Sequence, residues 1–523
     1  MAGVDEQDRS AGRTRAARSG RAGRTGRRPG RQRTGVSAPP FITRNIPPYD
    51  ILSEEGIRRI EDAADRILAE IGIDFRGDDE AIRLFAEAGA GVDGQRVRFE
   101  PGMIRELLKT APSEFTQVAR NPDRSVRIGG RHTVMAPAYG SPFVMDLDEG
   151  RRYGTIEDFR NFVKLACASP CLHHSGGTVC EPVDLPVNKR HLDMVYAHMR
   201  FSDKAFMGSV TAEERAEDSI EMSRILFGAD FVDANCVILG NVNVNSPLVW
   251  DGTMTKVTRA YARANQCTVV VPFILGGAMG PVTNAGAIAQ SVAEAMVGCA
   301  LTQLERPGAP CVFGNFLSST ALKSGSPTFG TPEPAVGSLV VGQIARRLGL
   351  PLRCSGSFTT SKLPDAQAMT ESTMSMLAAL QCGANFLLHS AGFLDGLLSM
   401  SYEKFILDAD LCGALHTYAR GVPVDDNQLA VDAFAEVGPG NHFFGCAHTL
   451  ANYETAYWES DIADNDPWET WAENGSVDAM TRANRRWKKM LADYEAPPLD
   501  EGTDEALRDF IDRRKSGMED AWH

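Results

Sequence analysis

The side chains that could do chemistry in this chain stand at or just beyond the ends of short apolar runs. They comprise three aromatic rings, two carboxylates, an asparagine, a histidine, and an arginine with a nearby serine: Tyr139, Phe316, Phe329, Glu181, Glu333, Asn243, His389, Arg353 and Ser355. Aromatic faces and carboxylates attract a cation, whereas an arginine binds an anion. Together they predict a binding site for a small zwitterion.

Several of these residues also have a purely structural interpretation. Asn243 can hydrogen-bond exposed loop amides, and Arg353 can be half of an ion pair. Glu333 lies in TPEP, where a helix is expected to begin, and the helix dipole favours a carboxylate there whatever the function. His389, at a strand end, can be a core histidine with its hydrogen bonds satisfied. Position alone does not decide between these alternatives.

Metal and nucleotide chemistry find less support in the sequence. CLHHSGGTVC holds Cys171, His173, His174 and Cys180, but neighbouring strand residues point to opposite faces and the spacing matches no closed zinc motif. We therefore predict no metal site. GNFLSSTALKSG matches no phosphate-binding pattern. Lys362 would form a Schiff base only if it were desolvated, and a solvated loop lysine is the simpler interpretation.

Eight apolar, glycine-containing runs must position these residues, and helical stretches separate them. The runs are VMAPAYG (134–140), LHHSGGT (172–178), AFMGS (205–209), VILGNVNV (237–244), VVVPFILGG (269–277), CVFGNF (311–316), PLRCSGS (351–357) and NFLLHSAG (385–392). Their midpoints lie roughly 32 to 42 residues apart, about what a buried parallel strand and its crossover helix require. The pattern predicts an α/β fold, a TIM (β/α)8 barrel with its site at the carboxyl ends of the strands.

Four segments follow from this pattern. Residues 1–40 form an Arg-rich tail expected to be disordered, and 45–130 an α-rich N-terminal cap whose first helix has Ser53 as its N-cap. The barrel occupies 131–395, and 396–523 form a helical C-terminal extension. The tail could contact nucleic acid, but a solvated extension is the favoured interpretation.

Composition narrows the class of protein further. The 523 residues carry a net charge of −14, although residues 1–35 hold ten arginines and only three acidic residues, so the remainder is more acidic still. No run of about 18 apolar residues is present to span a membrane, and we expect a cytoplasmic protein. The eleven cysteines lack the paired spacing of a disulfide scaffold and are expected to be reduced.

Several separated motifs resemble the trimethylamine methyltransferase superfamily from about residue 45 to the end. These motifs are GTVCEPVDLPVNKRH, NVNSPLVWD, GSPTFGTPEPAVGSLVVGQIARRLGLPLRCSGSFTTSKLPDAQAMTES, SYEKFILDADLCG and GPGNHFFGCAHTLANYETAYW. The resemblance implies a TIM barrel in which a methylated amine gives a methyl group to Co(I) of a separate corrinoid protein. No cofactor would then be bound tightly by this chain.

The resemblance also narrows the substrate. Founding members of the family carry pyrrolysine near the segment that corresponds here to 353–362, and only ordinary residues stand there. This departure favours the non-pyrrolysine branch, which demethylates quaternary amines such as glycine betaine, proline betaine and carnitine. A quaternary ammonium leaves as a neutral amine, so the site mainly has to orient it.

On this hypothesis Arg353 clamps the substrate carboxylate, with Ser355 beside it. Tyr139, Phe316 and Phe329 form an aromatic cage, Glu181 or Glu333 faces the ammonium, and Asn243 and His389 orient the bound molecule. The alternatives are a methyltransferase for another methylated amine or a sulfonium donor, and a catalytically silent barrel that senses betaines. The sequence leaves association into a homo-oligomer open.

Overall fold

The computed structural model describes residues 39–522, so the predicted N-terminal tail lies outside the described residues. Seven parallel strands form its centre, in the order β10 (Phe206–Met207), β11 (Ile238–Val244), β13 (Cys267–Gly276), β14 (Cys311–Gly314), β17 (Leu352–Ser355), β18 (Phe386–Leu388) and β7 (His132–Met135). The longest pairing, β11 with β13, runs from Leu239↔Cys267 to Val244↔Pro272. The molecule therefore has the predicted α/β class.

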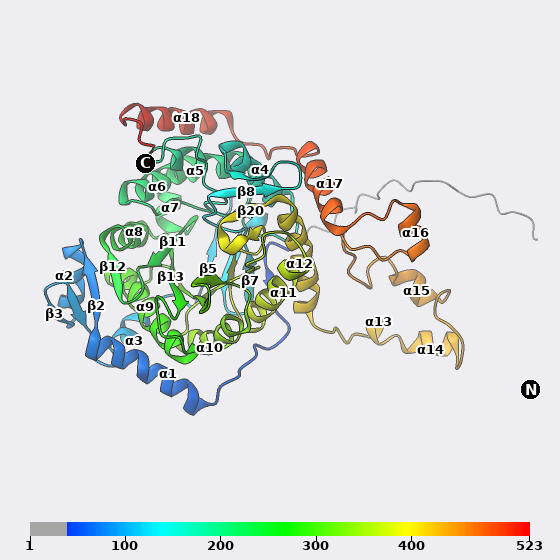
Figure 1. Cartoon of the computed structure of the whole chain (residues 1–523), viewed down its shortest axis with the longest axis horizontal. Helices are drawn as coiled ribbons and strands as arrows, with labels where there is room; N and C mark the ends of the chain where they lie inside the picture. The colour runs from blue at the N-terminus through cyan, green and yellow to red at the C-terminus, as the bar shows by residue number, and fades with distance from the viewer. Residues whose placement is uncertain (1–38, 523) are drawn as a thin grey trace, which may run out of the picture. The chain divides into compact units, whose positions relative to one another are not determined.

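Helices follow the strands as the spacing predicted. After β7 and the 172–178 segment come α4 (Ile156–Ala168) and α5 (Arg190–Phe201), and after the remaining strands come α6 (Glu213–Phe227), α8 (Gly252–Arg263), α9 (Asn284–Glu305), α10 (Pro332–Leu348), α11 (Ala366–Gln381) and α12 (Tyr402–Arg420). Figure 1 shows these helices arranged around the central strands. The carboxyl ends of the parallel strands form one edge, which we call the mouth.

One of the eight predicted strands, 172–178, is not a regular strand. It contributes one isolated parallel bridge, His174↔Ala205, and backbone hydrogen bonds to both neighbours: His173 N donates to Met135 O at 3.0 Å, and Met207 N donates to Gly176 O at 2.9 Å. No closed barrel of regular strands is found among residues 39–522. Gly176 has φ +96°, a conformation outside the strand region, which explains the interruption.

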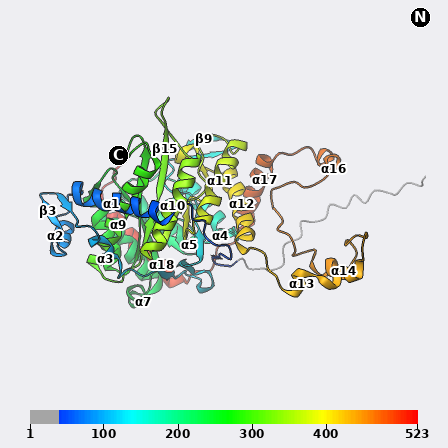
Figure 2. The ribbon, with the colours of Figure 1, turned by 90° about the horizontal axis from the view of Figure 1, so that it is seen from below.

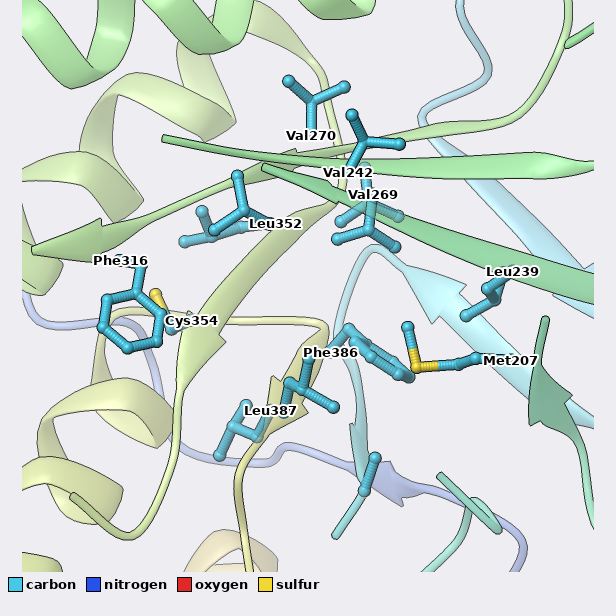
Figure 3. Packing of buried hydrophobic residues seen from close by; sticks show 14 of the residues in the cluster. Met207, Leu239, Val242, Val269, Val270, Phe316, Leu352, Cys354, Phe386 and Leu387 are labelled. Carbon is cyan, nitrogen blue, oxygen red and sulfur yellow. The ribbon is translucent and has the colours of Figure 1, made fainter. Parts of the chain in front are cut away.

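The hydrophobic core lies on both faces of the sheet. On one face Leu239, Val269 and Phe386 are fully buried, and Figure 3 shows their side chains meeting between the strands. Val270, which is also fully buried, follows Val269 on β13 and points to the opposite face. These runs read as continuous apolar segments because a parallel sheet is covered on both faces. One described helix, α9, is long and apolar enough to cross a membrane, yet 89% of its apolar window is buried inside the protein.

The segment before the sheet mixes helices and strands. It contains β1 (Ile42–Thr43), α1 (Glu54–Arg66), the π-helix Ile67–Ile71, β2 (Ile73–Arg76), α2 (Asp79–Glu87), β3 (Gly91–Asp93), β4 (Arg96–Arg98), α3 (Met103–Leu108), β5 (Glu114–Gln117), a 3-10 turn (Pro122–Arg124) and β6 (Val126–Gly129). Ser53 caps α1 as predicted, its hydroxyl accepting from Gly56 N. Strand β12 (Val249–Asp251) pairs with β2.

Two residues of this segment lie at the end of the sheet opposite the mouth. Arg44, 6% exposed, donates from Nη1 to Ala384 O at 2.7 Å and from Nη2 to Gly130 O at 2.9 Å. Gln117, fully buried, donates to Phe206 O and Val237 O at 2.8 and 3.2 Å. Their polar atoms satisfy strand carbonyls that would otherwise be buried without partners.

Further strands border the mouth: β8 (Phe143–Asp146), β9 (Gly150–Tyr153), β15 (Phe316–Ala321), β16 (Ser326–Thr328), β19 (Phe393–Leu394) and β20 (Ser399–Ser401), with a short turn at Asp395–Leu397. The remaining helices are α7 (Ala229–Ala234), α13 (Asp426–Leu429), α14 (Val431–Val437), α15 (Ala447–Asn452), α16 (Trp468–Glu473), α17 (Ala479–Ala492) and α18 (Glu501–Ser516). Ten of the eleven cysteines are buried, and no disulfide joins any pair within the described residues.

Candidate functional site

Arg353 is a buried cation without an acidic partner. It lies on β17, only 1% exposed, and no ion pair is formed by it among residues 39–522. Nη1 donates to Asn315 O at 2.7 Å and to Ser355 Oγ at 3.1 Å, while Nε has no hydrogen-bond partner. Burial lowers the pKa of Arg353 to about 9, so the guanidinium remains charged at neutral pH. A buried charge of this kind is costly unless an anion accompanies it.

Aromatic rings pack beside this guanidinium. The centroid of the Phe316 ring is 5.3 Å from Arg353 Cζ. Phe316 is the centre of a ring cluster, which we define as Phe316, Phe329, Phe358, His389 and Phe393. Phe358 lies 4.7 Å from Phe316 and 4.8 Å from Phe393 between ring centroids, and Phe329 contacts Phe316, Phe358 and Phe393 edge to face. The rings come from four different loops or strands at the mouth.

His389 belongs to this cluster and is held in a strained conformation. Its φ is +67°, which a residue with a Cβ seldom adopts. Its Nδ1 accepts from Tyr139 N at 3.2 Å, so the ring proton resides on Nε2. Burial, reinforced by the charge of Arg353, keeps the pKa of His389 well below its ordinary value. The imidazole is therefore neutral and has an Nε2–H to donate.

A buried ion pair on α12 supports two of the loops in the ring cluster. Asp408 Oδ1 accepts from Lys404 Nζ at 2.5 Å and from Ser357 Oγ at 2.6 Å, and Oδ2 accepts from Gly392 N at 2.9 Å. Lys404 Nζ also donates to Ser357 Oγ and Ser372 Oγ. The pair thus joins the loop carrying Phe358 to the loop between His389 and Phe393.

The other predicted residues lie in different surroundings. Glu181 is paired with Arg190 at 2.5 Å, and burial raises the pKa of its carboxyl group. Glu333 is exposed in the first turn of α10 and lines a separate hollow of about 340 Å³. Asn243 is exposed near the end of β11. The structure brings Arg353, Ser355, Phe316, Phe329, His389 and Tyr139 together and leaves these three outside the ring cluster.

Tyr139 contacts the site through its backbone, and its own hydroxyl is buried. Burial raises the pKa of the Tyr139 phenol to about 12. A Cβ built on Gly177 would approach the Tyr139 ring within 2.7 Å, so the ring packs directly on that glycine. The phenol is therefore protonated at neutral pH.

The residues considered for metal or Schiff-base chemistry are held in other ways. His173 Nδ1 accepts from Met135 N at 2.9 Å, whereas His174 Nε2 contacts Gln117 Oε1 at 3.2 Å. Lys362 is exposed and donates to Thr360 O at 2.7 Å, so it is not desolvated. Between residues 39 and 522 no three His, Cys, Asp or Glu side chains are grouped to hold a metal ion.

Sequence reasoning missed five residues of this arrangement: Ser357, Phe358, Phe393, Lys404 and Asp408. Phe358 follows the end of β17 by three residues, and Phe393 follows His389 by four, so each ring stands directly after one of the predicted apolar runs. Lys404 and Asp408 stand on a helix beyond the predicted sheet. Their i,i+4 spacing is ordinary for an exposed ion pair and carries no signal of burial.

Comparison with known proteins gives a consistent set of relatives. The family model for trimethylamine methyltransferase (MTTB) matches residues 18–519. The chain is 40% identical over 470 residues to a glycine betaine methyltransferase of Desulfitobacterium hafniense (strain Y51), covering 90% of this chain and 98% of that protein. It is 25% identical over 490 residues to a proline betaine:corrinoid methyltransferase of Eubacterium limosum, with 90% and 99% covered.

The likeness extends to methylamine methyltransferases. A trimethylamine methyltransferase of Methanosarcina barkeri (strain Fusaro / DSM 804) is 26% identical over 493 residues, covering 90% of this chain and 97% of that protein. The crystal structure of the Methanosarcina barkeri monomethylamine methyltransferase matches with a TM-score of 0.51 at 11% identity, covering 86% and 90% of the two chains. That structural match supports the α/β fold alone.

Proposed function

This chain belongs to the trimethylamine methyltransferase family, and on that premise we propose that it moves a methyl group from glycine betaine, or a close quaternary relative, to the Co(I) corrinoid of a partner protein. It is a methyltransferase by family. The choice of donor rests on the 40% identity to a glycine betaine methyltransferase together with the chemistry of the site.

The observation that carries the proposal is the unneutralised guanidinium of Arg353. A betaine carboxylate would supply the missing negative charge and accept from the unpartnered Nε. Neutral His389 would donate its Nε2–H to the same carboxylate. Because trimethylamine has no carboxylate, it would leave this cation uncompensated, which disfavours it as the donor.

The ammonium end of the substrate would be held mainly by rings. Phe316, Phe329 and Tyr139 are the proposed cage residues, and Phe358 and Phe393 extend the cage. Glu181 is already neutralised by Arg190, and a neutral His389 adds no repulsive charge beside the cation. Rings suit this role because positive charge on nitrogen falls during transfer, and a closely paired carboxylate would stabilise the ground state more than the transition state.

In the proposed reaction the carbon–nitrogen bond breaks with its electron pair left on nitrogen, and the methyl carbon passes to the reduced cobalt of the partner. The leaving group is a neutral tertiary amine, so no general acid is required. Arg353 and the rings therefore act by orientation, holding one methyl group toward the mouth.

The test is isothermal titration of the wild type, Arg353→Ala and Arg353→Lys with glycine betaine and with choline, which lacks the carboxylate. Loss of charge-assisted hydrogen bonds predicts that Arg353→Ala weakens betaine binding about 10- to 100-fold, with a smaller loss in Arg353→Lys. Choline binding should change little. An unchanged preference for betaine over choline in Arg353→Ala would remove Arg353 from the site.

Activity assays separate the proposed reaction from its alternatives. Loss of Co(I) absorbance on adding betaine and a corrinoid protein supports methyl transfer from betaine. If the Co(I) absorbance is lost only when a sulfonium or another methylated amine is added, that compound is the methyl donor in place of betaine. Tight betaine binding without any demethylation would identify a sensing protein instead.

We also propose that the parallel strands close into a (β/α)8 barrel through the 172–178 segment. The backbone bonds from His173 to Met135 and from Met207 to Gly176 support this closure, since they bridge β7 and β10, the two end strands of the parallel order. A closed barrel would place every strand's carboxyl end around one mouth. A cytoplasmic location fits a partner that carries reduced corrinoid.

A further inference from the structure

Residues 422–478, which we call the arm, leave the body of the protein after α12 and return at α17. The arm contains α13, α14, α15 and α16, none longer than seven residues. In both Figure 1 and Figure 2 these helices lie beyond α12 and α17, away from the central sheet. Helices this short are not stable alone in water and depend on packing against other surfaces.

The arm buries very little of its own apolar surface. Only Ala433, Cys446 and Ile462 are buried within it. In contrast, eleven large apolar side chains are between 38% and 88% exposed: Val422, Val424, Leu429, Val431, Phe434, Phe443, Phe444, Leu450, Tyr453, Tyr457 and Trp468. The arm thus presents apolar surface without a core beneath it.

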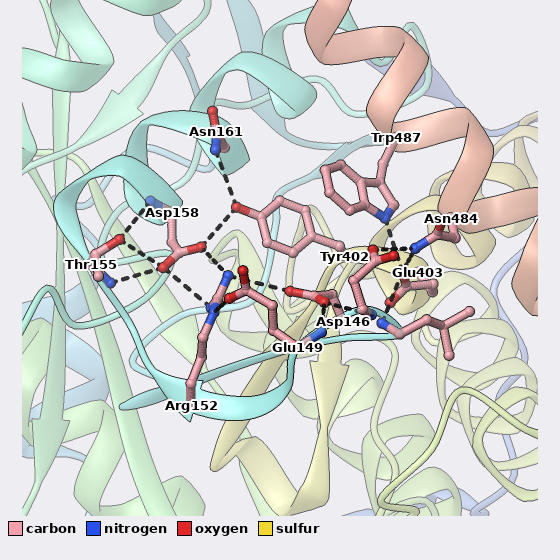
Figure 4. Close-up of polar contacts among 12 residues, drawn as sticks. Asp146, Glu149, Arg152, Thr155, Asp158, Asn161, Tyr402, Glu403, Asn484 and Trp487 are labelled. Atoms are coloured by element: carbon pink, nitrogen blue, oxygen red, sulfur yellow. Dashed lines mark hydrogen bonds and ion pairs between the residues drawn. The ribbon is translucent and has the colours of Figure 1, made fainter.

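Despite this exposure, the arm is held firmly where it meets the body. Ser460 Oγ and Asp461 N both donate to Asp410 of α12, at 2.6 and 2.9 Å. Beyond the arm, α17 docks through Trp487, which stacks on Tyr402 at 4.5 Å between centroids and donates to Glu403 at 2.9 Å (Figure 4). The arm is therefore anchored to the body at Ser460 and Asp461, close to the helix that follows it.

The charge of the arm limits what can cover it. It contains no lysine or arginine and twelve acidic residues: Asp425, Asp426, Asp432, Glu436, Glu454, Glu459, Asp461, Asp464, Asp466, Glu469, Glu473 and Asp478. Two arms packed directly on each other would bring these like charges together. The charge therefore disfavours a second arm as the covering surface.

The exposed area matches a permanent interface. Six of the eleven side chains are aromatic, at about 150–250 Å² each, and five are smaller valines or leucines. At their exposed fractions the eleven expose on the order of 1,000 Å², which exceeds the roughly 800 Å² that each partner gives to a standard stable interface. Surfaces this apolar are typical of homo-oligomers, whereas a corrinoid protein that leaves in every cycle would uncover them repeatedly.

We propose that the arm docks on the body of a second copy of this chain, and that the copies exchange arms in a closed oligomer. A two-fold exchange would bury each arm once and keep the acidic arms apart. This proposal is independent of the substrate, because it rests only on the exposure, anchoring and charge of residues 422–478.

Size-exclusion chromatography of the full-length protein, with light scattering to measure the mass that elutes, tests the proposal. The wild type should elute at a multiple of the 56.7 kDa chain mass. Replacing Phe444→Ser and Tyr457→Ser together should raise the dissociation constant at least roughly 30-fold, as expected for two interface anchors. The matched control is Tyr49→Ser, which removes an equally large ring that is 59% exposed outside the arm and should leave the mass unchanged.

A cross-linking experiment keeps the proposal testable if the double variant folds poorly. A photoreactive phenylalanine at position 444 in a mixture of light and heavy-isotope chains should give light–heavy cross-links to residues of the body. A monomeric wild type at micromolar concentration would overturn the proposal. So would cross-links confined to one chain or to the other arm.

Discussion

At the level of single side chains, Ser357 and Ser372 offer a direct measure of what the Lys404–Asp408 pair does. Both hydroxyls accept from Lys404 Nζ, at 2.7 and 2.8 Å, but only Ser357 lies in the loop of the ring cluster. We predict that Ser357→Ala lowers kcat/KM for betaine about tenfold, because the loop carrying Phe358 loses its attachment to Asp408. Steady-state kinetics with a corrinoid protein measure the effect.

Ser372→Ala is the matched control, since it removes a hydroxyl bonded to the same ammonium from α11. Its kcat/KM should remain near that of the wild type, and the thermal midpoints of the two variants should fall by similar amounts. Equal losses of activity in both variants would show that the pair only stabilises the fold.

The predicted residues that come together differ in one physical respect from the predicted residues that do not. Arg353, Phe316 and His389 lie at or next to strand ends, where parallel topology fixes the neighbourhood, and they do come together. Asn243, near the end of β11, and Glu333, in the first turn of α10, are exposed and lie outside the ring cluster, because spacing along the chain does not fix how the segments after each strand fold over the mouth. The assignment of roles to these residues stays a prediction.

At the level of elements, Gly356 controls how closely two mouth loops approach. A Cβ at this position would lie 2.8 Å from the backbone of His389 and Ser390. We predict that Gly356→Ala pushes the loop after β17 away from the loop after β18, and that the free energy of unfolding falls by about 1–3 kcal/mol. Denaturant titration and betaine titration measure the two consequences.

Gly91→Ala provides the reference for this prediction. Gly91 is exposed on β3 and its added Cβ would find only Arg98 O, at 3.9 Å. Stability and betaine affinity should remain close to those of the wild type. If Gly356→Ala bound betaine as tightly as this control, the close approach of the two loops would have no role in binding.

The elements themselves were largely predictable. Long apolar strands such as β13 and amphipathic helices with clear caps, such as α1 after Ser53, follow from periodicity and capping chemistry. The 172–178 run was less predictable because its two glycines and two histidines carry weak strand preference, and its backbone instead bonds to both neighbours as irregular chain. The strands within 45–130 are only three or four residues long, too short for a periodic signal.

At the scale of the whole molecule, buried histidines should govern stability in acid. His198 contacts Ser175 Oγ through Nδ1 and Gly177 O through Nε2, each at 2.7 Å, and burial lowers the pKa of His198 to about 4. His198 is therefore protonated near pH 6.5 in the unfolded chain but only near pH 4 in the folded protein. Between pH 7.5 and 5 this difference should remove roughly 2 kcal/mol of stability.

Denaturant titrations at the two pH values test this expectation in the wild type and in His198→Gln. The variant should be less stable at pH 7.5 yet lose about 2 kcal/mol less on acidification. His442→Gln, at an exposed position of the arm, should keep the pH response of the wild type. An identical acid response in His198→Gln would place the sensitivity elsewhere.

Arg44 and Gln117 satisfy strand carbonyls at the end of the sheet away from the mouth, and the proposed site lies at the mouth. Because the corrinoid carrier would approach that same mouth, the amine would have to bind before the carrier arrives, and the spent amine would leave only after the carrier withdraws. Turnover should then follow a compulsory order, and an excess of carrier should slow it by blocking the entrance.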